Sequence, residues 1–250
     1  MELGLKGKVV LIAGSSRGIG KAIACKFLEE GCHVVLSGRD RESLESTVEE
    51  FRARFRKENV ARFNGDLTRQ NDCDRYVQVA LSEWGRVDIA VANIGSGRGA
   101  PFEVSDRAEW LRVFEVNLFG GMDFVRHVIP VMKTQRSGAI CLVASITGAE
   151  AIDAPIPYTS AKAGVIASGK ALARYLGDFN IRVNVVSPGN VFFPGGDWEN
   201  RLKKDEAQVP LKRFGNPEEI ATCVVFLTSE CASFVTGASL VIDGGQTRAF

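Results

Sequence analysis

Short runs of apolar and β-branched residues recur along the chain, and longer amphipathic stretches separate them. Such runs are typical of strands buried on both faces of a parallel sheet, and the stretches between them are typical of covering helices. The pattern predicts strands at Val9–Ala13, Val34–Leu36, Ala61–Phe63, Ile89–Ala92, Ala139–Ala144, Val183–Val186 and Leu240–Ile242. We therefore expect an α/β fold with a doubly wound, seven-stranded parallel sheet and helices on both faces.

One helix start is predicted at the segment Asn216-Pro217-Glu218-Glu219. Asparagine is a favourable N-cap, proline is tolerated at the first helical position, and carboxylates in the first turn complement the helix dipole. We expect a helix to begin there.

Composition and charge narrow the function classes. The 250 residues contain no linker, low-complexity tract or repeat, so we expect a single domain over residues 1–250. A net charge of +1 offers no general attraction to nucleic acid or to an anionic membrane. A secretory leader and an apolar run near about eighteen residues are both missing, which favours a reduced, cytoplasmic setting.

The cysteine and histidine positions argue against a metal site. The six cysteines form no Cys-x-x-Cys pair, and His33 and His127 accompany no cysteine or carboxylate motif. We expect no metal.

A glycine-rich turn follows the first predicted strand, with the sequence Gly14-Ser15-Ser16-Arg17-Gly18-Ile19-Gly20. A strand, a glycine turn and a helix N-terminus together form an anion site, because unpaired N–H groups and the positive end of the helix dipole face the ligand. An ordinary turn is the alternative for an isolated match. Its place after the first strand favours a dinucleotide.

Polar and turn residues also follow the later strands. Asp66, Asn93, Ser145 and the pair Pro188-Gly189 come directly after the third, fourth, fifth and sixth apolar runs. Ligands of doubly wound sheets bind beyond the carboxyl ends of the strands. We therefore expect these residues to meet at one site.

Tyr158 and Lys162 are four residues apart and would share one face of a helix. A charge about 4 Å away is worth roughly 4 kcal/mol at an effective dielectric near 20, which corresponds to about three pKa units. The Lys162 ammonium is therefore expected to lower the pKa of the Tyr158 phenol into the range of a general acid–base catalyst. By itself this spacing also occurs by chance.

The order and spacing of these motifs resemble the short-chain dehydrogenase/reductase family. The resemblance spans Gly7 to Gly245 and implies a Rossmann-type fold. It is carried by Gly14 to Gly20, Asn93 with Gly95, Asn117, Ser145, Tyr158 with Lys162, and Pro188-Gly189.

By resemblance, four residues form the catalytic set. Tyr158 would be the acid–base group, and Lys162 its activator and a ligand of the ribose. Ser145 would hold the substrate oxygen, and Asn117 would help to order a proton-relay water near Lys162. The alternatives without a catalytic role are a strand-end hydroxyl for Ser145, a helix kink at Asn117 and a solvated charge for Lys162.

The end of the second strand bears on the choice of cofactor. An NAD site places a carboxylate there, whereas an NADP site places a cation for the 2′-phosphate. Gly38 stands at the usual acidic position, Arg39 follows, and Arg17 could add a second cation. Asp40 is expected to start the next helix. The prediction is NADP(H) in preference to NAD(H), with a solvated loop residue as the alternative for Arg39.

The resemblance also implies a set of cofactor contacts. They are Gly14, Ser16, Arg17, Gly18, Ile19, Gly20, Arg39, Asp66, Leu67, Asn93, Gly95, Tyr158, Lys162, Pro188, Gly189 and Val191. Two departures from the family pattern bear on these contacts. Ala13 lacks a hydroxyl that often ties the turn to a neighbouring strand, and Phe193 stands where threonine often contacts the nicotinamide amide.

The substrate is expected to lie under a lid at about 190–212. Ser145 and Tyr158 would contact it, together with Phe192, Phe193 and Trp198 of the lid. Apolar walls favour a hydrophobic or acyl-type ketone over a bare sugar, although the aromatic residues could instead pack the lid down.

These observations predict an NADP(H)-dependent oxidoreductase acting on a ketone or secondary alcohol, of the 3-oxoacyl-carrier-protein reductase type. The alternatives are a catalytically silent nucleotide-binding regulator and an NAD-dependent dehydrogenase of a sugar or polyol. A sugar-nucleotide epimerase is disfavoured, because such chains carry a longer C-terminal domain. The resemblance implies a homotetramer with a small-molecule substrate and no nucleic-acid or membrane partner.

Overall fold

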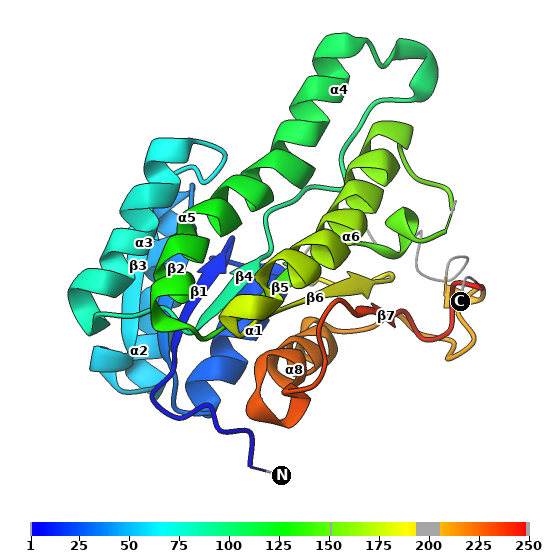
Figure 1. Cartoon of the computed structure of the whole chain (residues 1–250). Helices are drawn as coiled ribbons and strands as arrows, with labels where there is room; N and C mark the ends of the chain where they lie inside the picture. Colours follow the sequence, from blue (N-terminus) through cyan, green and yellow to red (C-terminus); the bar gives the residue numbers. More distant parts are fainter. Residues whose placement is uncertain (1, 151, 194–205, 249–250) are drawn as a thin grey trace.

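The computed structural model describes residues 2–150, 152–193 and 206–248. Its strands form one fully parallel, seven-stranded sheet in the order β3-β2-β1-β4-β5-β6-β7 (Figure 1), which confirms the predicted fold class. The strands are β1 (Val9–Ala13), β2 (His33–Gly38), β3 (Val60–Asn64), β4 (Ile89–Ala92), β5 (Gly138–Val143), β6 (Ile181–Pro188) and β7 (Ser239–Ile242).

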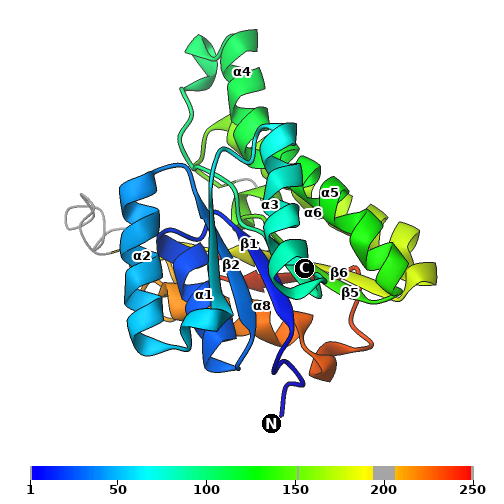
Figure 2. The same cartoon turned by 90° about the vertical axis from the view of Figure 1, so that its left-hand side faces the viewer.

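Helices cover both faces of the sheet (Figures 1 and 2). One face carries α1 (Gly18–Glu29), α2 (Arg41–Arg54) and α8 (Pro217–Thr228). The other carries α3 (Gln70–Trp84), α5 (Gly120–Gln135) and α6 (Ile156–Leu176). The short α4 (Arg107–Phe114) precedes α5 and extends away from the sheet at the top of Figure 1.

Alternation along the strands supplies a separate core to each face. In β1, Val10 and Ile12 pack under α1 and α8, whereas Val9 and Leu11 pack under α3 and α5. All four side chains are at most 1% exposed. Complete burial of such a side chain stabilises the fold by about 1.5–3 kcal/mol. A strand buried on both faces needs apolar residues throughout, which explains the continuous run in the sequence.

The predicted helix start at Asn216 is confirmed. Asn216 Oδ1 accepts a hydrogen bond from Glu219 N at 2.9 Å, and Glu219 Oε2 accepts one from Asn216 N at 2.9 Å. This reciprocal pair is a capping box, which satisfies two N–H groups at the start of α8.

The sheet reverses its winding direction at β1, which lies between β2 and β4. Chain connections lead to opposite sides of this point, so a crevice opens beyond the carboxyl ends of β1 and β4.

Two further observations concern membrane spans and metal sites. None of the helices in the described ranges is long and apolar enough to cross a membrane. Within those ranges, no group of three or more His, Cys, Asp or Glu residues could hold a metal ion.

Candidate active site

The turn between β1 and α1 is shaped by its glycines. Gly14 and Gly18 have φ angles of 77° and 59°, a region that glycine adopts without strain. A Cβ added at Gly20 would overlap the carbonyl oxygen of Gly14, so only glycine is accommodated there. No side chain in the described part of the chain caps the start of α1. Its first N–H groups and the positive end of the helix dipole are therefore suited to a phosphate.

Two side chains from other strands hold this turn in place. Asn93, after β4, donates from Nδ2 to the oxygen of Gly14 at 2.9 Å, and the Oγ of Ser37 in β2 accepts from Gly14 N at 2.9 Å. The Ser37 hydroxyl thus supplies the tie between turn and strand that Ala13 cannot make. Ser37 was not among the predicted site residues. A hydroxyl at the end of the apolar run Val34–Leu36 is the sequence signal that points to it.

The end of β2 presents the cation of Arg39, followed by the carboxylate of Asp40, and both line the first cavity. A Cβ added at Gly38 would lie 2.9 Å from the Cβ and Oγ atoms of Ser16, which leaves little room for a side chain. The Arg39 side chain is exposed. Asp40 accepts a hydrogen bond from Ser43 N at 2.8 Å and caps α2, as expected from the sequence. That hydrogen bond from Ser43 holds the pKa of the Asp40 carboxyl below its usual value.

A cavity of about 340 Å³ lies beyond the carboxyl ends of β1, β2 and β4. Two exposed arginines and an uncapped helix N-terminus converge on it, a donor set that fits a dinucleotide with an additional phosphate. Asp66 is held there by Thr68, whose N and Oγ1 donate to Asp66 Oδ1 at 3.1 and 2.9 Å. Its lining includes the predicted residues Gly14, Ser16, Arg17, Arg39, Asp66, Leu67, Asn93 and Gly95.

Asn117 lies in a π-helical turn, Glu115–Phe119, between α4 and α5. Its Nδ2 donates to Val113 O at 3.0 Å and its Oδ1 accepts from Ser96 N at 2.8 Å, while the residue is 3% exposed. A Cβ added at Gly95 would lie 3.1 Å from both Asn117 Oδ1 and Lys162 Nζ. The amide of Asn117 and the ammonium of Lys162 therefore both lie close to Gly95. Single π turns inside helices are frequent at functional sites.

The other three predicted catalytic residues come from the end of β5 and the start of α6. Ser145 follows β5 and caps a 3-10 turn, Ile146–Gly148, by accepting from Thr147 N at 3.3 Å. Tyr158 and Lys162 lie one helical turn apart in α6. Lys162 Nζ donates to Val143 O at 2.9 Å and lies 5.9 Å from the centre of the Tyr158 ring.

Burial shifts both ionisable groups toward their neutral forms. It raises the pKa of the half-buried Tyr158 phenol, while a hydrogen bond with Ser145 opposes the rise. Burial lowers the pKa of the Lys162 ammonium to about 8. The expected net lowering of the Tyr158 pKa is therefore not found in this structure. Burial of the phenol is the larger cause, and the hydrogen bond with Ser145 is the cause that acts against it.

A second cavity, of about 870 Å³, continues from the first. Both are lined by Asn93, Ile94 and Gly95. The second adds further predicted residues: Ile19, Ser145, Tyr158, Lys162, Pro188, Gly189, Val191 and Phe193. The structure thus brings the glycine turn, the ends of β4, β5 and β6, and the start of α6 to one continuous cleft.

The three predicted lid side chains differ in position. The ring of Phe193 packs over the start of α1, 3.2 Å from the place of a Cβ at Gly18, and lines the larger cavity. Phe192 is 40% exposed and does not belong to the described lining of either cavity. Trp198 lies outside the described residues, as do residues 194–205 of the predicted lid.

Comparison with known proteins gives consistent matches over almost the whole chain. Residues 13–247 match a family model described as enoyl-(acyl carrier protein) reductase. A 3-oxoacyl-(acyl-carrier-protein) reductase of Thermotoga maritima is 36% identical over 243 residues, which cover 96% of this chain and 98% of that protein. A dehydrogenase subunit of Thauera aromatica, which acts on (2S)-[(R)-hydroxy(phenyl)methyl]succinyl-CoA, is 34% identical and covers 98% of each chain.

A solved structure is similar over its full length. It is the L-sorbose reductase of Gluconobacter frateurii, in complex with NADPH and L-sorbose. The two chains are 32% identical, each is covered completely, and the TM-score is 0.94.

Proposed function

The chain belongs to the short-chain dehydrogenase/reductase family, and we propose that it is an NADP(H)-dependent reductase of hydrophobic ketones. The observation that carries this proposal is the continuous cleft, in which an uncapped helix N-terminus and two arginines lie at one end and Ser145, Tyr158 and Lys162 at the other. Oxidoreduction of a ketone or secondary alcohol is the activity that the family and its named reductases share.

The proposed proton donor is Tyr158. Its raised pKa keeps the phenol protonated at neutral pH, which is the form that can protonate a carbonyl oxygen. Ser145 Oγ would donate a hydrogen bond to the same oxygen, and this bond strengthens as negative charge develops there. Lys162 Nζ would favour the phenolate that remains after proton transfer. Asn117, beside Lys162, would help to order the water that restores the proton.

The cofactor residues are proposed on the same basis. A bound nicotinamide dinucleotide supplies or accepts the hydride. Gly14, Gly18 and Gly20 would allow its pyrophosphate to approach the start of α1, and Arg17 with Arg39 would bind a 2′-phosphate. Asp66 and Leu67 would flank the adenine. Asn93, Gly95 and the segment Pro188–Val191 would line the nicotinamide end.

For the substrate, we favour a ketone with an apolar body, including 3-oxoacyl thioesters. Ile152, Pro155, Ile156, Val191 and Phe193 give the larger cavity apolar walls, and a close relative in sequence reduces 3-oxoacyl groups on a carrier protein. We further propose a homotetramer, the assembly implied by the family resemblance. Size-exclusion chromatography with light scattering measures that assembly.

Turnover with matched substrates and both cofactors tests the function. We expect absorbance loss at the reduced nicotinamide band with NADPH, and at least about tenfold higher kcat/KM for a hydrophobic 3-oxo ester or thioester than for a ketohexose. No turnover across the panel would favour the catalytically silent regulator, and a preference for the ketohexose would overturn the substrate class.

A charge variant tests the cofactor assignment. Arg39→Ala should raise the KM for NADPH about tenfold, because a phosphate loses one charge-assisted contact, and should leave the KM for NADH within twofold. Arg41→Ala is the matched control, since Arg41 is also exposed but does not line the first cavity. Lower KM for NADH than for NADPH in the unmodified protein would contradict the assignment.

A further inference from the structure

One wall of the larger cavity is formed by residues of the loop between the Ser145 turn and α6. Within this loop, Ile152, Asp153, Ala154 and Pro155 line the cavity. The loop is anchored at its start, where Glu150 N donates to Ile146 O at 2.9 Å, and at its end, where Thr159 N donates to Pro155 O at 3.0 Å. Its conformation decides the shape of the space in front of Tyr158.

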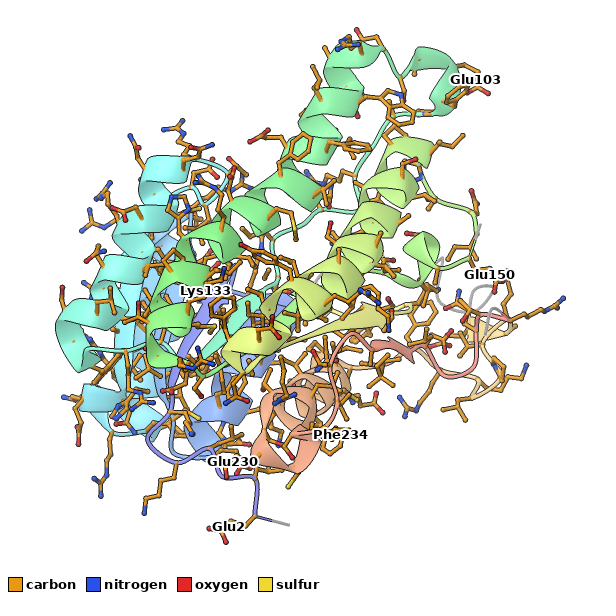
Figure 3. All side chains as sticks on the ribbon, in the orientation of Figure 1. Glu2, Glu103, Lys133, Glu150, Glu230 and Phe234 are labelled. Carbon is orange, nitrogen blue, oxygen red and sulfur yellow. The ribbon has the colours of Figure 1, made fainter. Side chains whose placement is uncertain are left out.

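A C-terminal turn organised by Asp243 reaches this loop. Asp243 Oδ1 accepts from Gly245 N at 2.8 Å, and Oδ2 accepts from Thr247 N at 2.7 Å and from Thr247 Oγ1 at 2.8 Å. The chain thereby leaves β7 in a fixed direction. Arg248 N then donates to Glu150 Oε2 at 2.5 Å. Figure 3 shows Glu150 on the same side of the molecule as the C-terminal segment.

The same turn contacts the two described segments that flank residues 194–205. A Cβ added at Gly189 would lie 2.6 Å from Asp243 Cβ, and one added at Gly244 would lie 2.8 Å from Val209 Cγ1. Leu211 N also donates to Gly244 O at 3.3 Å. The C-terminal turn therefore touches three separate parts of the chain around the substrate side of the cleft. Among the described residues, no contact of this turn involves the glycine turn or the end of β2.

We propose that Glu150 is a positioning residue, which holds the Ile152–Pro155 wall through the backbone N–H of Arg248 and so sets the affinity for the ketone. This inference rests on the proposed function of the cleft. Glu150 need not touch the substrate: its carboxylate links the loop to a turn that Asp243 keeps rigid. Loss of this hydrogen bond frees the loop Ile152–Pro155 to move and leaves the first cavity unchanged.

Paired variants test the link. Glu150→Ala removes the acceptor, and Arg248→Pro removes the donor, because proline has no backbone N–H. Each should raise the KM for the ketone about fivefold, the worth of one partly exposed charge-assisted hydrogen bond, with kcat and the KM for NADPH within twofold. The double variant should also raise the KM for the ketone about fivefold, because both changes break the same hydrogen bond.

Two conservative variants are the controls. Glu150→Gln keeps an acceptor oxygen and should restore the KM to within twofold, and Arg248→Ala keeps the N–H and should behave in the same way. An unchanged KM in Glu150→Ala, multiplied effects in the double variant, or an equal rise in the KM for NADPH would each overturn the proposal.

Hydrogen exchange separates this proposal from the proposed function. In Glu150→Ala and in Arg248→Pro, the backbone amide of Ala149, which donates to Ile146 O at 3.0 Å at the start of this loop, should exchange about fivefold faster than in the unmodified protein, whether or not any ketone is reduced. Exchange unchanged in both variants would overturn the link. An absence of turnover together with faster exchange would overturn the reductase and leave the link standing.

Discussion

At the scale of single residues, the cleft places two ionisable groups where water is scarce. The Tyr158 phenol becomes harder to ionise and the Lys162 ammonium loses its proton more easily, with a pKa of about 8. Near pH 7 the tyrosine is therefore neutral and the lysine still largely charged. This combination suits proton donation to a carbonyl oxygen, because Tyr158 carries the proton and the charged Lys162 would stabilise the phenolate that forms.

The rate of reduction should depend on pH through Lys162. We expect kcat/KM to fall as the pH rises through about 8, because the ammonium then loses its charge. Burying Lys162 destabilises the fold below about pH 8, and this destabilisation is relieved between about pH 8 and 10.5, where the unfolded chain binds more protons. A pH–rate profile of the unmodified protein and of Lys162→Met, which should lack that inflection, measures the effect. A flat profile up to pH 10 would contradict it.

Removal of the phenolic oxygen should isolate its chemical role. Tyr158→Phe should lower kcat by at least about a thousandfold, because the variant lacks the hydroxyl that we propose as the proton donor, and leave the Kd for NADPH within twofold. Tyr175→Phe is the control in the same helix, because Tyr175 is 63% exposed. Single-turnover kinetics and fluorescence titration give the two quantities. Substantial residual turnover in Tyr158→Phe would refute the assignment.

Sequence reasoning reached some of these residues and not others. Tyr158, Lys162 and Ser145 were predicted from their spacing and from a strand-end position, and the structure places all three at one cavity. The direction of the Tyr158 pKa could not, since it depends on burial that spacing does not reveal. Ser37 was missed for a related reason: its hydrogen bond to Gly14 joins residues 23 positions apart.

At the scale of elements, the apolar runs predicted the position of each described strand, but several predicted strand ends differ from those in the structure. The run Val183–Val186 marks only the middle of β6, which spans Ile181–Pro188, because polar Arg182 precedes the run and Ser187 follows it. The side chains of Arg182 and Asn184 donate to backbone carbonyl groups near the end of α8 and in the following segment. The π turn at Asn117 left no recognisable period in the sequence.

The capping box of α8 offers a stability test. Asn216→Ala should lower the free energy of unfolding by about 1 kcal/mol, because Glu219 N loses its acceptor. Urea denaturation monitored by circular dichroism gives this quantity. Asn71→Ala, at an exposed position in α3, should change it by less than about 0.5 kcal/mol. Equal effects of the two substitutions would argue against the cap.

At the scale of the whole molecule, one sheet carries both the cavity proposed for the cofactor and the cavity proposed for the substrate. The apolar pattern predicted a doubly wound, seven-stranded parallel sheet, and the family resemblance implied a Rossmann-type fold. Neither could predict the path of the C-terminal turn to Glu150, because that contact joins residues 98 positions apart.

Cofactor binding should stabilise the entire chain, since the first cavity is assembled from several strands. NADPH at about one hundred times its Kd should add about 2.7 kcal/mol, which corresponds to a rise in Tm of roughly 5–10 °C for a chain of this size. NADH at the same concentration should give a smaller rise. Differential scanning fluorimetry compares them, and equal shifts would contradict selectivity for the phosphorylated cofactor.

The pairing of β1 with β4 has a consequence for biosynthesis. Val10 of β1 lies beside Ile89 of β4, so the pair of strands β1 and β4 cannot form until β4 has emerged from the ribosome. Strands β1 to β4 are then complete, whereas Ser145, Tyr158 and Lys162 have still to be translated. A chain terminated soon after β4 would carry the glycine turn and Arg39, which we propose for the dinucleotide, and none of the three residues that we propose to move the proton.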